Sequence, residues 1–331
     1  MRVTGAEVAR RAGVSVATVS YVLNDAPDQR ISPQTRETVV RIARELGYRP
    51  NAAARSLRTG HGTTVLFPLP GMRPSHVLSQ IIDACTAALD ERGLSLVTDY
   101  AGYGDIESQL AAWARLDPAA VIDLLIPHDS PVRAALRDAG VPIVSAAVPG
   151  ETSWESTGDA FARAERLTQL RYLLDRGHRR VVFVLPPNSA PNRLEEIAIR
   201  QLRAEATARD ARLKIRRARL TREAMTALAA DWIAQDLGEA LAAYNDDYAI
   251  GAISALTAAG IRVPQDVAVM GVDDMPLASV VTPAITTIAA EFDEFSVALA
   301  DSVADTLRDG NNHAVRPLPT PGHRLVIRDS A

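Results

Sequence analysis

The chain has 331 residues, of which 47% are hydrophobic and 23% charged, with a formal net charge of −4. This composition predicts a globular protein of more than one domain and excludes an intrinsically disordered chain. No uninterrupted apolar run reaches the roughly 20 residues of a membrane-spanning helix, and no signal-peptide pattern opens the sequence. We therefore expect a cytoplasmic protein with no membrane partner.

The charge is distributed unevenly along the chain. Residues 1–60 contain ten arginines and five acidic residues, so this segment carries +5 while the rest of the chain carries −9. A small basic segment attached to an acidic body is typical of a protein whose basic part meets nucleic-acid phosphates. A chance cluster of arginines remains the alternative.

The first predicted helix starts at Thr4 and extends to about Ala12. Thr4 and Glu7 have the spacing of a capping box, in which the hydroxyl and the carboxylate each accept a free backbone N–H. Gly13 follows, at a position where a sharp turn favours a residue without a side chain. The next helix is thereby placed at an angle to the first.

The second predicted helix covers residues 14–23, with Ser15 as its N-cap. Val19, Val22 and Leu23 recur at helical spacing and predict an inward apolar face. In a helix-turn-helix, the opposite face of this helix meets base edges in the major groove. An ordinary amphipathic helix is the alternative on periodicity alone. The outward side chains are Val16, Ala17, Ser20 and Tyr21.

A third helix is predicted from Ser32 and Pro33 to Gly47, with a cap at its start and a glycine at its end. Its buried stripe is predicted to consist of Val39, Val40, Ala43 and Leu46. Three short helices thus form an all-α head at residues 1–49. A short alanine-rich helix follows in residues 50–60; it is marginal in isolation, so we expect it to order only when paired with its copy on DNA.

The body alternates short apolar runs with helical patterns. Such alternation predicts an α/β fold of parallel sheets covered by helices on both faces, and the number of strands predicts two doubly wound lobes. The predicted strands are 63–67, 94–98, 121–126, 141–147, 180–185, 213–217, 240–244 and 267–271, and a helix is predicted at 76–92.

The first sixty residues resemble the LacI/GalR family of bacterial transcriptional repressors. A chance match at so many spaced positions is very improbable. The residues that carry the resemblance are Val3, Thr4, Glu7, Val8, Ala9, Ala12, Gly13, Val14, Ser15, Thr18, Val19, Ser20, Val22, Leu23, Asn24, Ser32, Thr35, Arg36, Leu46, Gly47, Tyr48, Pro50, Asn51, Ala54, Arg55 and Leu57.

This resemblance implies specific contacts with DNA. Val16 and Ala17 are expected to read bases, and Ser15, Thr18 and Asn24 to hold phosphates. Leu57 aligns with the hinge-helix leucine that wedges into the minor groove and bends the duplex. Tyr21 replaces an arginine common in the family, and it either contacts DNA or packs at the rim of the head. The expected DNA-binding residues are Thr4, Ser15, Val16, Ala17, Thr18, Ser20, Tyr21, Asn24, Asn51, Ala54 and Leu57.

The body is similar to the same family, whose core looks like periplasmic sugar-binding proteins. The marks lie mostly in the second lobe: residues 177–180, 245–246, 260–267, 271–274 and 283–288. Three crossings between lobes are expected near Gly158, Ala289 and Pro319. The first lobe is then 61–157 with about 290–318, and the second is 158–289 with about 319–331.

Open α/β sheets bind ligands at the carboxyl ends of their strands. The resemblance therefore places a small effector, a sugar or related metabolite, in a cleft between the lobes. Asn245 is also expected to cap the helix that follows it. The expected effector contacts are Arg73, Ser75, Arg193, Asn245 and Asp273.

Three departures from the family weaken the expectation of a familiar sugar site. Residues 72–76 replace an Asn-Pro-aromatic segment, Phe161 and Ala162 replace an Asp-Asn pair, and Glu196 replaces a glycine. The cleft has thus lost contacts that would hold a sugar. An absent effector remains an alternative.

Catalysis, metal binding and cofactor binding are not indicated. The sequence has no catalytic serine or zinc-protease motif and no phosphate-binding glycine loop. The pairs Asp246–Asp247 and Asp273–Asp274 imitate an acid/base pair, but no nucleophile accompanies them. Cys85, the single cysteine, is expected as a small buried hydrophobe in a helix.

The sequence thus predicts a homodimeric transcriptional repressor, not an enzyme, that binds a near-palindromic DNA operator and responds to an effector. The alternative is a DNA-binding regulator whose body only dimerises. A solute receptor or an enzyme would have no use for the basic head.

Overall fold

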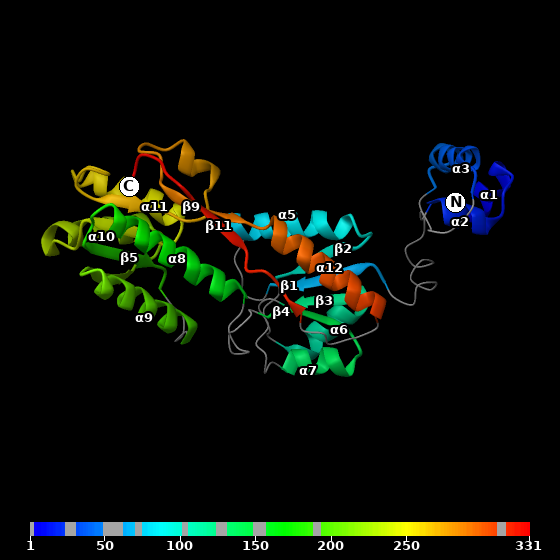
Figure 1. Cartoon of the computed structure of the whole chain (residues 1–331), viewed down its shortest axis with the longest axis horizontal. Helices are drawn as coiled ribbons and strands as arrows, with labels where there is room; N and C mark the ends of the chain where they lie inside the picture. Colours follow the sequence, from blue (N-terminus) through cyan, green and yellow to red (C-terminus); the bar gives the residue numbers. More distant parts are fainter. Residues whose placement is uncertain are drawn as a thin grey trace. The chain divides into compact units, whose positions relative to one another are not determined.

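The computed structural model describes most of the chain and divides it into two units. One unit is the head, residues 1–64 with 117–119, and the other is the remaining body. Figure 1 labels the elements of both. The described residues are 3–23, 31–48, 62–69, 75–100, 105–123, 131–147, 157–187, 193–309 and 316–331.

The head consists of three short helices around one apolar core. The helices are α1 (Gly5–Ala12), α2 (Val16–Leu23) and α3 (Pro33–Glu45). Val19, Val22, Val39 and Ala43 of the predicted stripes are buried, whereas Leu23, Val40 and Leu46 are partly buried, and α3 adds Ile42, which was not predicted. The buried members of this core are Val8, Ala9, Val19, Val22, Val39, Ile42 and Ala43.

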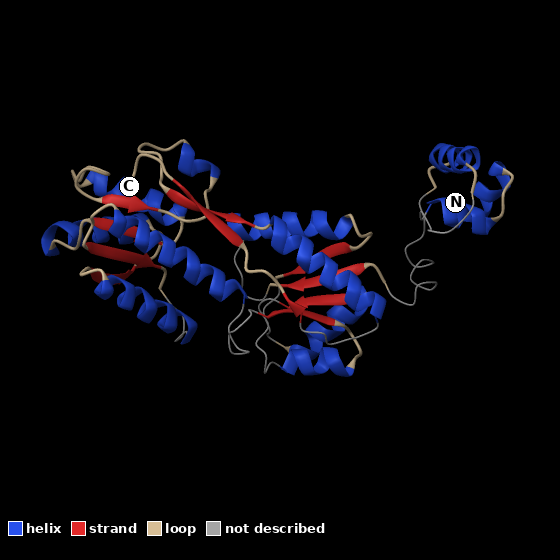
Figure 2. Cartoon of the chain, in the orientation of Figure 1, coloured by secondary structure: helices blue, strands red, loops and turns tan. Residues whose placement is uncertain are grey.

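The first lobe of the body is a five-stranded sheet in the order β10-β4-β3-β1-β2. Helices lie on both of its faces (Figure 2). Its strands are β1 (Thr64–Pro68), β2 (Ser95–Asp99), β3 (Ala120–Asp123), β4 (Ile143–Ala147) and β10 (Arg316–Pro317). Its helices are α5 (His76–Asp90), α6 (Ile106–Leu116), α7 (Pro131–Asp138) and α12 (Asp293–Asp309).

Alternate residues of β1 enter two different cores. Val65 and Phe67 pack with α5 and α12, whereas Leu66 packs with Trp113 of α6 and Leu136 of α7. A parallel strand covered on both faces therefore reads as a continuous apolar run. Cys85 is fully buried in α5, where burial raises the pKa of its thiol to about 12, so it is the buried hydrophobe that was predicted.

The second lobe is a four-stranded parallel sheet in the order β6-β5-β7-β8, again between two layers of helices. The predicted doubly wound α/β class is therefore confirmed. Its strands are β5 (Arg180–Leu185), β6 (Arg212–Arg217), β7 (Ala240–Ala243) and β8 (Ala268–Met270). Its helices are α8 (Thr157–Asp175), α9 (Arg193–Ala208), α10 (Arg222–Gln235), α11 (Asp246–Ala258) and the 3₁₀ turn η1 (Pro276–Ser279).

A two-stranded antiparallel ribbon follows the second lobe. It pairs β9 (Thr287–Glu291) with β11 (Gly322–Val326), in a register that places Ile288 opposite Leu325. The sequence analysis missed both strands and β10, because none is a long apolar run with flanking turn signals. The predicted crossing point near Ala289 falls within β9 and the one near Pro319 falls just before β11, and the lobe boundaries stay a prediction.

Candidate functional site

Side-chain caps start both α1 and α2, and a tight turn at Gly13 joins the two helices. Thr4 accepts a hydrogen bond from the Glu7 N–H at 3.4 Å, while the Glu7 carboxylate accepts from Arg10. Gly13 has a φ of 67°, in the left-handed region that glycine adopts without strain. The Ser15 hydroxyl then accepts from the Thr18 N–H at 3.0 Å and lies 2.9 Å from the Thr18 hydroxyl. The predicted cap of α2 is therefore confirmed.

The N-terminal turn of α2 presents small side chains to solvent. Val16 is 54% exposed, and Ser15 and Ala17 are also exposed. Ser20 and Tyr21 are half-buried, because Val19 and Val22 turn the opposite face into the core. The structure thus groups the predicted base readers at one end of one helix. The predicted contacts Asn24, Asn51, Ala54 and Leu57 lie outside the described residues.

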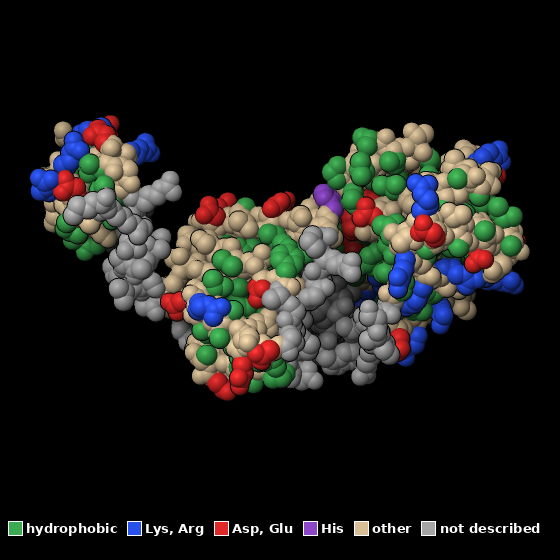
Figure 3. All heavy atoms as spheres, turned by 180° about the vertical axis from the view of Figure 1, so that it is seen from behind, with side chains coloured by type: hydrophobic (Ala, Val, Ile, Leu, Met, Phe, Trp, Pro, Cys, Tyr) green, Lys and Arg blue, Asp and Glu red, His purple; other side chains and the backbone are tan. Residues whose placement is uncertain are grey.

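The helices next to α2, which are α1 and α3, carry charged side chains of both signs. Arg10 and Arg11 of α1 are exposed, and Arg10 forms an ion pair with Glu7. On α3, Arg41 pairs with Glu45 at 2.7 Å. The face of the head seen in Figure 3 carries both basic and acidic side chains.

In the second lobe, Asn245 and Asp273 come together at the carboxyl edge of the sheet. Asn245 follows β7 and caps α11, because its side-chain oxygen accepts from the Tyr248 N–H at 3.1 Å. Its side-chain amide donates to the carboxylate of Asp273, which follows β8. One asparagine thus both starts the helix and orients the carboxylate, so the cap and the proposed ligand contact coexist.

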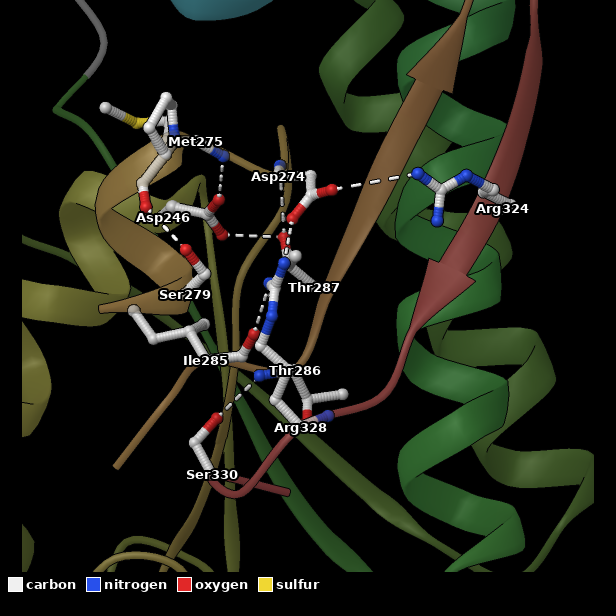
Figure 4. Close-up of polar contacts among 11 residues, drawn as sticks. Asp246, Asp274, Met275, Ser279, Ile285, Thr286, Thr287, Arg324, Arg328 and Ser330 are labelled. Carbon is white, nitrogen blue, oxygen red and sulfur yellow. Dashed lines mark hydrogen bonds and ion pairs between the residues drawn. The ribbon is translucent and has the colours of Figure 1, made fainter. Parts of the chain in front are cut away.

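Asp246, the residue after Asn245, is fully buried, and Figure 4 shows its polar contacts. Its carboxylate accepts from the Thr287 hydroxyl at 2.6 Å and from the Met275 N–H at 2.8 Å. A Cβ on residue 271 would collide with this carboxylate, so Gly271 is needed for the approach. These bonds tie α11 to η1 and β9.

Asp274 is held by arginines of the C-terminal segment (Figure 4). Arg328 donates to Asp274 at 2.6 Å and also to the Ile285 carbonyl at 2.9 Å, and Arg324 lies 3.9 Å from the same carboxylate. Asp274 has a φ of 48°. Residues 273–274 therefore form a bonded, half-buried arrangement and not a solvated turn.

Burial raises the pKa of the carboxyl groups of Asp246 and Asp273. The pKa of Asp246 rises to about 6, opposed by its hydrogen bonds from Thr287 and Met275. The pKa of Asp273 rises to about 7, because burial and the charge of Asp246 outweigh the bond from Asn245. Titration near neutral pH at a strand edge is a feature of many binding sites.

Of the other three predicted effector contacts, only Ser75 has a side chain within the described part of the chain. Ser75 is the N-cap of α5, where its hydroxyl accepts from the Leu78 N–H at 3.2 Å. Arg193 is the first residue of α9, but the description covers only its backbone, and Arg73 lies outside the described residues.

The sequence analysis missed several residues of this site. Thr287 lies in the segment 283–288 that carries the family resemblance, but no local pattern indicates its bond to Asp246, and Arg328 comes from a distant segment. Glu165 and Gln169 of α8 are buried polar side chains, and their burial depends on tertiary packing that no periodicity marks.

Two further observations concern the described residues alone. No helix among them is long and apolar enough to cross a membrane. Within the same part of the chain, no group of three or more His, Cys, Asp or Glu side chains is arranged to hold a metal ion.

A helix-turn-helix head followed by a two-lobed parallel α/β body defines a class of DNA-binding transcriptional regulators. Residues 6–51 match the family model of bacterial regulatory proteins of the lacI family, and residues 170–331 match that of the periplasmic binding protein-like domain. The chain therefore carries a DNA-binding domain of the lacI family of bacterial regulatory proteins and a periplasmic binding protein-like domain.

Similar proteins support this assignment along the whole chain. The transcriptional regulator GalS of Salmonella typhimurium is 29% identical over 99% of this chain and 98% of its own. The structure of a CelR–cellobiose complex is 26% identical, with a TM-score of 0.63 and all of both chains covered. The Lac repressor bound to ONPG is 25% identical, with a TM-score of 0.70 and all of both chains covered. These relatives are regulators and not enzymes.

Proposed function

We propose that this chain is a repressor that binds a near-palindromic operator as a homodimer and is controlled by a small effector, a sugar or related metabolite. The observation that carries the DNA-binding part is the exposed N-terminal turn of α2, capped by Ser15 and supported by a closed three-helix core. A twofold dimer presents two such helices, and its binding site therefore has twofold symmetry.

In this proposal Val16 and Ala17 contact base edges, while the hydroxyls of Ser15 and Thr18 bind phosphates. Val16 suits an apolar contact with a thymine methyl because more than half of its side chain is exposed. Tyr21 offers one hydroxyl and a ring edge at the rim of the head. Thr4, Ser20, Asn24 and the hinge residues Asn51, Ala54 and Leu57 complete the expected DNA contacts.

The effector would bind at the carboxyl edge of the second-lobe sheet. Asp273, oriented by Asn245, accepts hydrogen bonds from adjacent donors of a ligand. The CelR relative was solved in complex with cellobiose, which supports a small-molecule effector for this chain. Arg73, Ser75 and Arg193 are the other proposed contacts. Binding would control the head only if the ligand prefers one arrangement of the lobes.

The test of DNA recognition begins with selection of bound fragments from random duplex at modest salt. A double variant, Val16→Thr with Ala17→Gln, is expected to prefer a different sequence from the parent and to keep its melting temperature. Glu37→Gln, on the exposed face of α3, is the matched control and keeps the parental preference. A parent protein with no preference over random duplex would overturn the proposal.

The effector part is tested by thermal unfolding with sugars, nucleosides and small acids. A ligand at 100 times its dissociation constant adds about 2.7 kcal/mol to the stability of the folded protein. Absence of stabilisation across such a panel would favour a regulator whose body only dimerises. The departures from the family pattern at Phe161, Ala162 and Glu196 support this second candidate, a regulator without an effector.

A further inference from the structure

Helix α8 turns two polar side chains into the interior of the second lobe. Phe161, Glu165 and Gln169 are spaced by four residues, so they lie on one face of the helix. Glu165 is only 6% exposed and Gln169 is fully buried. Burying a polar group lowers the stability of the fold unless the group is hydrogen-bonded. The burial of Glu165 and Gln169 therefore suggests that these side chains have a function.

Gln169 fixes where this polar face lies. Its side-chain amide donates to the carbonyls of Ala243 at 3.0 Å, Met270 at 2.9 Å and Gly271 at 3.3 Å. These carbonyls stand at the carboxyl ends of β7 and β8, where Asn245 and Asp273 also lie. The polar face of α8 therefore adjoins the proposed effector site.

The same face leaves acceptors unused. The Oε1 atoms of Glu165 and Gln169 are both buried without a hydrogen-bond partner in the described part of the chain. The amide of Gln169 is already committed to three carbonyls, so its oxygen is held in place as an acceptor. Together with the carboxylate of Asp273, the site offers acceptors in excess of donors.

Among the described residues, Arg166 compensates the carboxyl group of Glu165 only in part. Arg324 and Arg328 pair with Asp274. Arg166 lies 5.9 Å from the centre of the Tyr244 ring and lowers the pKa of Glu165 less than burial raises it. Burial, followed by the charge of Asp273, raises the pKa of Glu165 to about 8. Protons therefore neutralise this pair of carboxyls near neutral pH.

We propose that Glu165 and Asp273, with the side-chain oxygen of Gln169, bind the protonated amine of a small effector. This inference rests on the proposed function and names the chemical class of its ligand. An ammonium group brings three N–H donors and one positive charge, which matches three acceptors and two acidic groups. A neutral polyol supplies donors but leaves the carboxyls to be neutralised by protons.

Amine binding would then release protons from the pair. The ammonium restores the charged form of Glu165 and Asp273, so the ligand and the protons compete for the same oxygens. Affinity for an amine is therefore expected to increase as pH rises from 6 to 8. A purely structural role for Glu165 would give no such dependence.

The test uses the full chain and matched pairs of amine and neutral probes. The pairs are glucosamine with glucose, galactosamine with galactose, and putrescine with 1,4-butanediol. Binding is followed by thermal shift and by calorimetry in two buffers of different ionisation enthalpy. We expect at least one amine to bind saturably with proton release and its neutral partner to bind at least tenfold more weakly.

Glu165→Gln is the decisive variant, because it keeps the shape and neutrality of the protonated residue and so preserves the fold. It is expected to weaken amine binding at least tenfold, whereas Asp247→Asn, at a neighbouring half-buried carboxyl, changes it less than twofold. Equal binding of a neutral probe, unchanged amine binding by Glu165→Gln, or stabilisation by no amine overturns the inference. Sequence preference for DNA, measured on the same samples, reports separately on the proposed function.

Discussion

The start of α2 and the carboxyl edge of the second lobe are built in opposite ways. The former displays small, exposed side chains above an apolar core, and the latter buries charged groups in a bonded network. Val16 is 54% exposed, whereas Asp246 is fully buried. A change at the first surface is expected to alter recognition and leave folding intact. A change at the second is expected to alter folding and its dependence on pH.

The largest expected effect is that of Asp246→Ala. This change leaves the Thr287 hydroxyl and the Met275 N–H buried without their acceptor. Loss of one partner in such a network costs about 3 kcal/mol. Urea unfolding followed by tryptophan fluorescence would measure the loss in the body, whose three tryptophans all lie outside the head.

Asp247→Ala is the matched control, since Asp247 is the next residue of α11 and is only half-buried. It is expected to change the free energy of unfolding by less than about 0.5 kcal/mol. Equal losses of unfolding free energy for the two variants would mean that the hydrogen bonds of Asp246 do not stabilise the fold. The difference drawn between the start of α2 and the edge of the second lobe would then be wrong.

The next effect is a pH dependence confined to the second lobe. The pKa values of Glu165, Asp273 and Asp246 are raised to about 8, 7 and 6. The folded protein therefore binds protons more tightly than the unfolded chain. The stabilisation that results is complete below about pH 4 and is lost progressively as pH rises from there through the folded-state pKa values of about 6, 7 and 8, at up to about 1.4 kcal/mol per pH unit for each group.

Burial lowers the pKa of His178 and His323, which gives the opposite trend below about pH 6.5. Measurements between pH 6.5 and 8.5 therefore isolate the carboxyls. In this range Glu165→Gln is expected to flatten the decline in unfolding free energy, while Glu196→Gln, an exposed change on α9, leaves it as steep. A parent protein whose stability is constant across this range would contradict the assignment.

The sequence predicted the strands and helices with apolar periodicity and much of the head, since these depend on local pattern. Residues 180–185 form β5 as predicted, and Ser15 and Asn245 cap their helices. The sequence did not predict the β9–β11 ribbon or the bond from Arg328 to Asp274, because these join segments more than 30 residues apart. Glu165 was missed because burial of a charged residue depends on tertiary packing, which no periodicity encodes.

In the head, the hinge leucine gives the largest expected change in DNA binding. Leu57→Ala removes the proposed apolar wedge, so the bent complex loses its insertion into the base step. Operator affinity is expected to fall at least tenfold and bending to decrease, with no change in the unfolding of the body. Fluorescence anisotropy and circular-permutation mobility assays measure the two effects.

Leu57→Met is the control for this change, because it keeps an apolar side chain of similar volume. It is expected to bind within threefold of the parent and to bend the operator to the same extent. Unchanged affinity and bending by Leu57→Ala would refute the wedge and would restrict DNA recognition to the three-helix head.

The smallest effect separates the cap of α2 from its proposed phosphate contact. Ser15→Ala removes the acceptor of the Thr18 N–H and is expected to cost about 1 kcal/mol of local stability. Hydrogen exchange of α2 in the full chain, followed by mass spectrometry, would show this as faster exchange. Thr18→Ala keeps the backbone bond and loses only the hydroxyl contact with Ser15. If both variants weaken operator binding but only Ser15→Ala speeds exchange, the hydroxyls act on DNA as well as on the helix. If binding falls only where exchange rises, Ser15 is a cap alone, and α2 reads DNA without phosphate contacts from these two side chains.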